Sequence, residues 1–324
     1  DGGGWIQIWA DALLVEGGIS ANGGPGTGYH AGSGAGGSIY IHTGSLSGGG
    51  TIYANGGGNE IGGGGGRIAI HYTECSLDAS HIMALGGHDI ELGHTAGNGT
   101  VFLRGPGQSF GDLVIDGNLQ ATPSASTPLP EGYTFNNILL RNQACVVADT
   151  PVRVLNMFSL THGSVLTHSP RLESGLVIQA NTIEVDADSA IDITGKGYPG
   201  GYTSANGAST GLTLGGLPGA QYRSGGSYGG LGAVVDGGTL TNPIYGHPAN
   251  PIYLGSGGSA GNYSASGGNG GGRLTITADT IRLDGALYAN GTTGAGYHAG
   301  SGSGGSILIE TSRLEGTGII TANG

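Results

Sequence analysis

The stretch "WIQIWADALLVEGGISANG" at residues 5–23 returns as "RLTITADTIRLDGALYANG" at residues 273–291. Positions 6, 8 and 10 keep small or apolar residues in both copies. Positions 5, 7 and 9 change from Trp, Gln and Trp to Arg, Thr and Thr. Positions that keep their character therefore alternate with positions that change. This alternation indicates a strand whose inner face is fixed and whose outer face is solvated.

The repeat extends well beyond this strand. Residues 1–56 align with residues 269–324 without a gap, and 31 of the 56 positions are identical. Looser copies, "RIAIHYTECSLDA" and "LVIQANTIEVDAD", begin at Arg67 and Leu176. Each copy reads as two or three short strands joined by tight corners, roughly 20 residues in all, which is typical of one coil of a β-solenoid.

We therefore predict an all-β fold, a right-handed parallel β-helix (β-solenoid) with long Gly-rich insertions. Essentially no α-helix is expected, because no segment sustains an apolar period of 3.6 residues. The predicted segments are 1–56, 57–194, 195–272 and 273–324. The predicted inner-face residues are Ile6, Ile8, Ile39, Ile41, Ile68, Ile70, Leu176, Ile178, Leu274, Ile276, Ile307 and Ile309.

Glycine accounts for 74 of the 324 residues. Solenoid coils stack about 4.8 Å apart, and glycine is favoured where backbones turn sharply or approach closely. Three tracts contain more glycine than sharp turns and close backbone approaches require: 23–38, 56–66 and 195–272. We predict that the last forms ordered, extended layers with polyproline-II-like segments; flexible linkers are the alternative. The tyrosines expected to hold these layers are Tyr198, Tyr202, Tyr222, Tyr228, Tyr245, Tyr253 and Tyr263.

Asn-Gly pairs mark the predicted corners. Such pairs commonly supply residues with positive φ, which tight turns need. The pairs begin at Asn22, Asn55, Asn206, Asn290 and Asn323.

Composition excludes some classes of function. The net charge is −12 and only 10 residues are Lys or Arg, which argues against nucleic-acid binding. No run of 18 apolar residues is present, so no transmembrane helix is expected. The first ten residues lack the pattern of a signal peptide, and the chain reads as a mature or excised piece. The pairing of Cys75 and Cys145 cannot be decided from their spacing.

Several segments resemble the large secreted Gly-rich parallel β-helix proteins of bacteria, members of the pectate-lyase-like superfold. The resemblance implies a surface, adhesive or filament-forming role without an assigned reaction. The segments that carry it are "GGSYGGLG" (225–232), "YLGSGGSAG" (253–261), "GGGRLTITADTIRLDGALYANG" (270–291), "GTVFLRGPGQSFGDLVID" (99–116) and "IDITGKGYPGG" (191–201).

Single candidate residues favour structural roles. His30 and His298 lie in identical Gly-rich turns without a second ligand at metal-binding spacing, so we expect structural histidines under the loop. His42 corresponds to Glu310 in the second copy, which leaves no shared role. Cys75 aligns with apolar inner-face residues, which predicts a buried, inert thiol.

Four acids fall at one equivalent position of the four copies: Glu16, Asp78, Asp186 and Asp284. We predict that they cap turns. Calcium at aligned corners is the alternative, because hard oxygen ligands suit this ion, but one carboxylate per coil is too few unless corners align. No cofactor is therefore predicted.

An enzyme is not predicted. Pectate-lyase-like hydrolases need paired aspartates on adjacent coils, and lyases need a basic residue near an Asp cluster. Here the arginines are scattered and the outer face changes freely between the copies. A polysaccharide lyase or hydrolase is the least favoured alternative.

Two non-enzymatic functions remain. The first is a structural protein that forms or extends an extracellular fibre on the cell surface, with itself as partner through end-to-end stacking or a tandem array. The expected repeat is about 268 residues, since the chain opens and stops within the repeated phrase. The second is an adhesin that binds cell-surface glycans through exposed aromatics. The residues named for an interaction surface are Trp5, Trp9, Tyr222, Tyr228, Tyr245 and Tyr253.

Overall fold

The computed structural model describes the chain except for residues 29, 60, 90–92, 120–124 and 235–240. The described residues form strands and three short 3₁₀ helices, which confirms the predicted all-β class and the lack of α-helix. The 3₁₀ helices are η1 (Ala79–His81), η2 (Leu214–Gly216) and η3 (Asn262–Ser264). No helix of the described part is long and apolar enough to cross a membrane.

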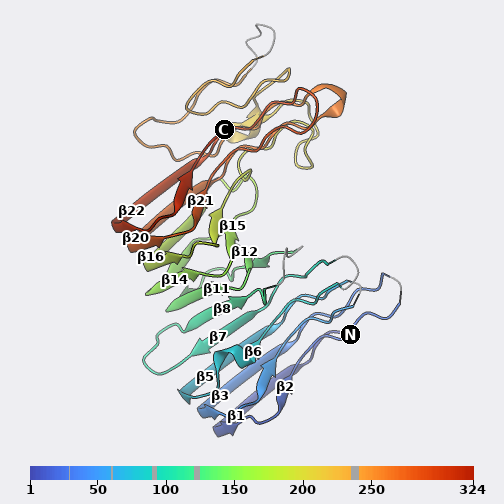
Figure 1. The fold of residues 1–324 in the computed structure, drawn as a ribbon, viewed down its shortest axis with the longest axis vertical. Helices are drawn as coiled ribbons and strands as arrows, with labels where there is room; N and C mark the ends of the chain where they lie inside the picture. Colours follow the sequence, from blue (N-terminus) through green and yellow to red (C-terminus); the bar gives the residue numbers. More distant parts are fainter. Residues whose placement is uncertain (29, 60, 90–92, 120–124, 235–240) are drawn as a thin grey trace.

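The largest sheet has twelve strands and runs through most of the molecule (Figure 1). It comprises β1 (Trp5–Leu14), β3 (Ser38–Ser47), β5 (Arg67–Cys75), β7 (Thr100–Arg104), β8 (Asp112–Asp116), β10 (Thr134–Phe135), β11 (Asn137–Arg141), β13 (Val152–Val154), β14 (Met157–Leu160), β16 (Leu176–Val185), β20 (Arg273–Leu283) and β22 (Ser306–Glu315). All pairs in it are parallel except β7 with β8.

Short strands follow the long ones and form smaller sheets. A parallel six-stranded sheet contains β9 (Thr127–Pro128), β12 (Cys145–Val147), β15 (Val165–Thr167), β17 (Ala190–Asp192), β21 (Ala286–Tyr288) and β23 (Ile319–Thr321). A parallel three-stranded sheet contains β2 (Gly18–Ser20), β4 (Thr51–Tyr53) and β6 (Ile82–Met83). An antiparallel pair is formed by β18 (Leu212–Thr213) and β19 (Leu217–Pro218).

The two copies of the repeat adopt the same pairing. In the first copy Trp5 pairs with Ser38, and in the second Arg273 pairs with Ser306, so both use a spacing of 33 residues. The expected length of about 20 residues per repeat is found only in the middle, where β11 pairs with β14 at a spacing of 20. The repeats at both ends of the chain are longer because the Gly-rich tracts lie within them.

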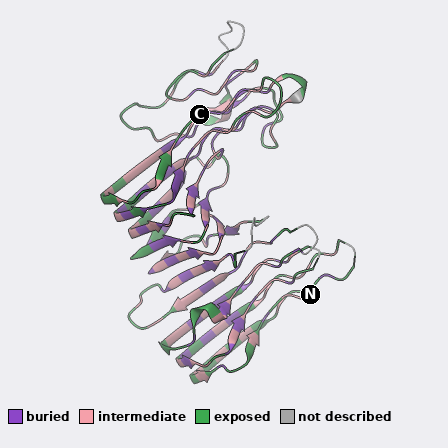
Figure 2. Ribbon diagram, viewed as in Figure 1, coloured by how far each residue is buried: buried purple, intermediate pink, exposed green. Residues whose placement is uncertain are grey.

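The predicted inner face is confirmed. Eight of the twelve named residues are buried, and the others pack partly buried against the same cores. The partly buried ones are Ile6 and Ile8 on β1 and Ile307 and Ile309 on β22. Both strands lie at an edge of the sheet, where a side chain has a neighbouring strand on one side only. Figure 2 shows the buried residues alternating along the strands.

Glycines outside the strands allow backbones to touch. In the N-terminal half, Gly34 donates to Gly24 O at 2.9 Å, and Gly57 donates to Gly34 O at 2.8 Å. In the C-terminal half, residues 254–260 are all buried and bond to several neighbouring segments. A Cβ on Gly270 would lie 1.9 Å from Gly255 O. Such contacts exclude any larger residue.

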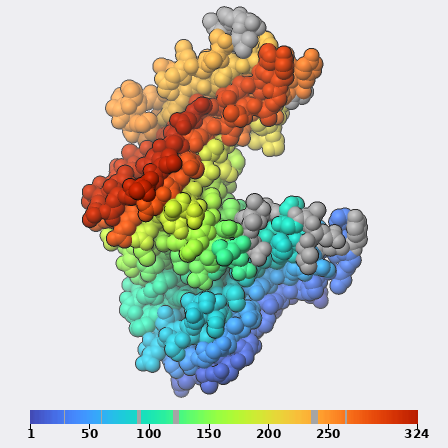
Figure 3. All heavy atoms as spheres, in the orientation of Figure 1, coloured from blue at the N-terminus to red at the C-terminus, as the bar shows by residue number. Residues whose placement is uncertain are grey.

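Gly-rich segments project from both ends of the molecule and leave a hollow between them (Figure 3). The middle repeats, β8 to β17, are spaced by 19 to 26 residues and carry no comparable tract. The hollow therefore follows from where the sequence places its glycines.

Two expectations about single residues are wrong. None of the five Asn-Gly pairs has positive φ; the left-handed residues include Gly48 and Gly316, which are equivalent in the two copies. Cys75 pairs with buried Leu46 as expected but is itself exposed, because β7 ends before it can cover the end of β5.

Candidate functional site

The two tryptophans lie on the outer face of β1, as predicted from the alternation of the strand. The side chains of Trp5 and Trp9 are 73% and 63% exposed, while Ile6 and Ile8 between them point to the core. Trp5 makes no ring contact among the described residues. Trp9 does, and it is the first member of a larger group.

That group is a continuous row of rings across four neighbouring strands, here called the aromatic stripe. The ring centroids of Trp9 and His42 are 4.8 Å apart, and those of His42 and His71 are 6.1 Å apart. Tyr40 lies 5.6 Å from Trp9 and 5.4 Å from His71. Phe102 extends the row at 5.6 Å from His71. The aromatic stripe thus comprises Trp9, Tyr40, His42, His71 and Phe102.

Parallel pairing creates this row. Trp9 pairs with His42, His42 with His71, and His71 with Arg104, so equivalent outward positions stack along the sheet. Sequence reasoning missed the row because His42 was compared with its copy Glu310 rather than with its neighbours in space. The available signal was the 33-residue spacing, which separates Trp9 from His42 as it separates Ile6 from Ile39.

A shallow groove of about 250 Å³ adjoins the aromatic stripe. Arg104 lies at its end, where the guanidinium Nε donates to Gln108 O at 3.2 Å. Partial burial, and then the charges of Arg104 and His42, lower the pKa of His71, so its ring is neutral at pH 7. The groove is lined by His42, Thr43, His71, Tyr72, Thr73, Arg104 and Gly105.

The four named tyrosines divide into two kinds. Tyr222 is 72% exposed and has no ring contact among the described residues. Tyr228, Tyr245 and Tyr253 form a half-buried cluster, with centroid distances of 5.0 Å and 6.2 Å. The Tyr245 hydroxyl donates to Leu254 O, and burial raises its pKa. These three rings hold the Gly-rich segments together.

Three of the four aligned acids bond to the backbone near turns. Asp78 accepts from Ser80 N at 2.8 Å, Asp186 from His162 N at 2.6 Å, and Asp284 from Thr317 N at 3.0 Å. This agrees with turn capping for these three, whereas no bond is found for the Glu16 side chain within the described residues. No group of three or more His, Cys, Asp or Glu residues in the described part is placed to hold a metal ion.

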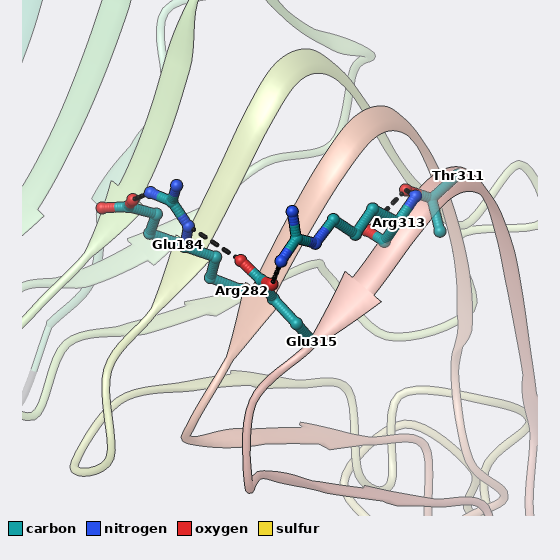
Figure 4. Close-up of polar contacts among 5 residues, drawn as sticks. All are labelled: Glu184, Arg282, Thr311, Arg313 and Glu315. Atoms are coloured by element: carbon teal, nitrogen blue, oxygen red, sulfur yellow. Dashed lines mark hydrogen bonds and ion pairs between the residues drawn. The ribbon is translucent and has the colours of Figure 1, made fainter.

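A second outward row carries charges instead of rings. Arg282 on β20 forms ion pairs with Glu184 on β16 and with Glu315 on β22, and Arg313 also contacts Glu315 (Figure 4). The Arg282 side chain is 56% exposed, so solvent screens these ion pairs and they add little to the stability of the fold. These ion pairs join side chains on neighbouring strands and do not form a reactive site.

His30 and His298 are not under their loops. Both are exposed and have positive φ, 55° and 61°. Arg223 Nη1 lies 3.2 Å from His298 Nδ1. These histidines are turn residues at equivalent places in the two copies.

Among these features, the aromatic stripe is the longest row of ring contacts on the outer face of the sheet within the described residues. Comparisons with protein-family models, with curated proteins and with solved structures find no match.

Proposed function

We propose that this chain is a structural repeat segment of an extracellular cell-surface fibre, folded as a right-handed parallel β-helix. Long and short parallel strands alternate along the chain, and residues with equivalent positions stack between neighbouring repeats. On either side of the antiparallel β7–β8 pair, such an arrangement supports a chain that winds repeatedly through the sheets.

One observation carries the proposal: the two near-copies share a register but have different neighbours. β3 of the first copy is followed by β5, whereas β20 of the second copy is preceded by β16. The 56-residue unit therefore has a partner-accepting edge on both sides. Stacking on both sides is what a tandem fibre requires.

The stacking of isoleucines on the inner face also supports a tandem array. Ile39 and Ile41 stack on Ile68 and Ile70, which would be the next partners of Ile307 and Ile309 in a tandem array. Burying the exposed parts of these edge side chains would contribute about 25 cal/mol per Å² of apolar surface.

The proposal assigns no reaction to the chain. Described carboxylates that come close to other groups are occupied in turn caps or ion pairs, such as Asp284 with Thr317 and Asp116 with Arg141. The extracellular location rests on the resemblance of the Gly-rich segments to secreted proteins.

An extended chain tests the proposal. Residues 57–324 are appended directly after Gly324, which continues the repeat in register. The control joins a second copy of residues 1–324 through a flexible Gly/Ser linker of similar total length. Small-angle X-ray scattering then gives the maximum dimension and the cross-section of each particle.

We expect the extended chain to scatter as one continuous rod with the cross-section of the parent. The linked control should scatter as two bodies joined by a mobile tether. A two-body profile for the extended chain would contradict the proposal.

A further inference from the structure

The second copy of the repeat is an internal control for the aromatic stripe. Where the first copy has Trp9, Tyr40 and His42, the second has Thr277, Leu308 and Glu310 on the equivalent strands. Both copies fold with the same strand pairing. The fold therefore does not need the rings.

Of these rings, only Phe102 is among the side chains that pack against the buried cores. Their strands place isoleucines inside, and Trp9 and His42 remain exposed. Contiguous exposed apolar surface on a soluble protein commonly marks a binding site. The aromatic stripe is a partly exposed surface of this kind across β1, β3, β5 and β7. Trp9 and His42 are exposed, and Tyr40, His71 and Phe102 are half-buried.

The shape of the aromatic stripe indicates which class of ligand it would bind. The row is a narrow line of rings, two rings wide at β3, where Tyr40 and His42 both contact Trp9. Five rings fall well short of the roughly 20–30 residues per side of a stable protein interface. The net charge of −12 disfavours a nucleic acid. A linear polymer with flat, partly apolar rings matches a line of aromatic rings.

Polar groups line the groove beside the rings. Arg104, Thr73 and the imidazole of His71 line the adjoining groove and supply donors and acceptors. Sugar rings present C–H groups on their faces and hydroxyls around their rims, so they use both features at once.

We propose that the aromatic stripe binds an extended, uncharged carbohydrate chain that lies across β1, β3, β5 and β7, with sugar rings stacked on Trp9, Tyr40 and Phe102. This site lies on the outer face of the sheet, whereas the fibre proposal uses the free backbone edges of the end strands. Each proposal can therefore fail without the other.

The experiment measures binding of neutral hexasaccharides to the 324-residue chain. The probes are cellohexaose, chitohexaose and xylohexaose, with hyaluronan fragments as an acidic comparison, and the method is isothermal titration calorimetry. The double variant Trp9→Thr/Tyr40→Leu carries the residues of the second copy, so it should fold. The matched control Trp5→Arg also carries the residue of the second copy, outside the stripe.

We expect at least one neutral hexasaccharide to bind the parent chain. The double variant should weaken this binding tenfold or more, and Trp5→Arg should leave it within twofold. Circular dichroism and the melting temperature verify that both variants are folded.

Three results would overturn the proposal. They are no binding of any neutral probe to the parent, equal binding to the parent and the double variant, and tighter binding of the hyaluronan fragments than of every neutral probe.

Discussion

The backbone N–H of Asn55 donates to Oδ1 of Asn22 at 2.8 Å, and its equivalent, Asn323, donates to Asn290 Oδ1 at 2.7 Å. In the first copy the row continues, because Asn55 Oδ1 accepts from Leu85 N at 2.8 Å. The "ANG" motif is thus a ladder of side-chain bonds between repeats, in place of the positive-φ corner that its sequence suggests.

Removing one step of this ladder should destabilise the fold. Asn55→Ala leaves the partly buried N–H of Leu85 without its acceptor, so we expect a loss of about 1–2 kcal/mol in the free energy of unfolding. Urea denaturation measures it. The control is Asn181→Ala, an exposed residue without a side-chain bond among the described residues, which should change stability by less than about 0.5 kcal/mol. Equal effects of the two changes would refute the ladder.

The Gly-rich layers should tolerate alanine only where space is open. Gly270→Ala places a Cβ against Gly255 O, where only backbone could move, and should cost about 1–3 kcal/mol. Gly207→Ala meets no atom within 4 Å and serves as the matched control. Thermal unfolding compares the two variants. If Gly270→Ala melts with the parent, the close packing of these segments is wrong.

His168 should make the protein sensitive to acid. Its side chain is fully buried, Nδ1 lies 2.8 Å from Ser169 O, and burial is the main cause that lowers its pKa below 6.5. The unfolded chain then binds a proton that the folded chain does not. Stability is accordingly unaffected above pH 6.5 and falls as the pH drops below it.

The test compares the parent with His168→Gln between pH 8 and pH 5. The variant should be less stable at pH 8, and the difference should narrow as the pH falls, because the variant has no proton to take up. A constant difference for His168→Gln would contradict this role of His168.

Sequence reasoning succeeded where equivalent positions of the two copies of the repeat could be compared. The inner face followed from positions that stayed apolar in both copies, and the structure buries Ile39, Ile41 and their equivalents. The outward tryptophans followed from the same alternation.

Sequence reasoning failed for properties that depend on the neighbouring strand, namely burial and side-chain contacts. Cys75 has the sequence position of a core residue, but β7 is too short to cover it. The aromatic stripe joins His71 and Phe102, which belong to no close copy of the repeat. Which outward residues meet depends on the spacing between paired parallel strands, and that spacing varies from 19 to 98 residues along the chain.

Hydrogen–deuterium exchange at β22 tests the central claim of the fibre most directly. In the 324-residue chain, alternate amides of β22 face away from β20 and should exchange fast. In the chain extended by residues 57–324, the same amides should be protected to the level of β3, whose outer edge is covered by β5. Unchanged fast exchange of β22 in the extended chain would contradict stacking of the repeats.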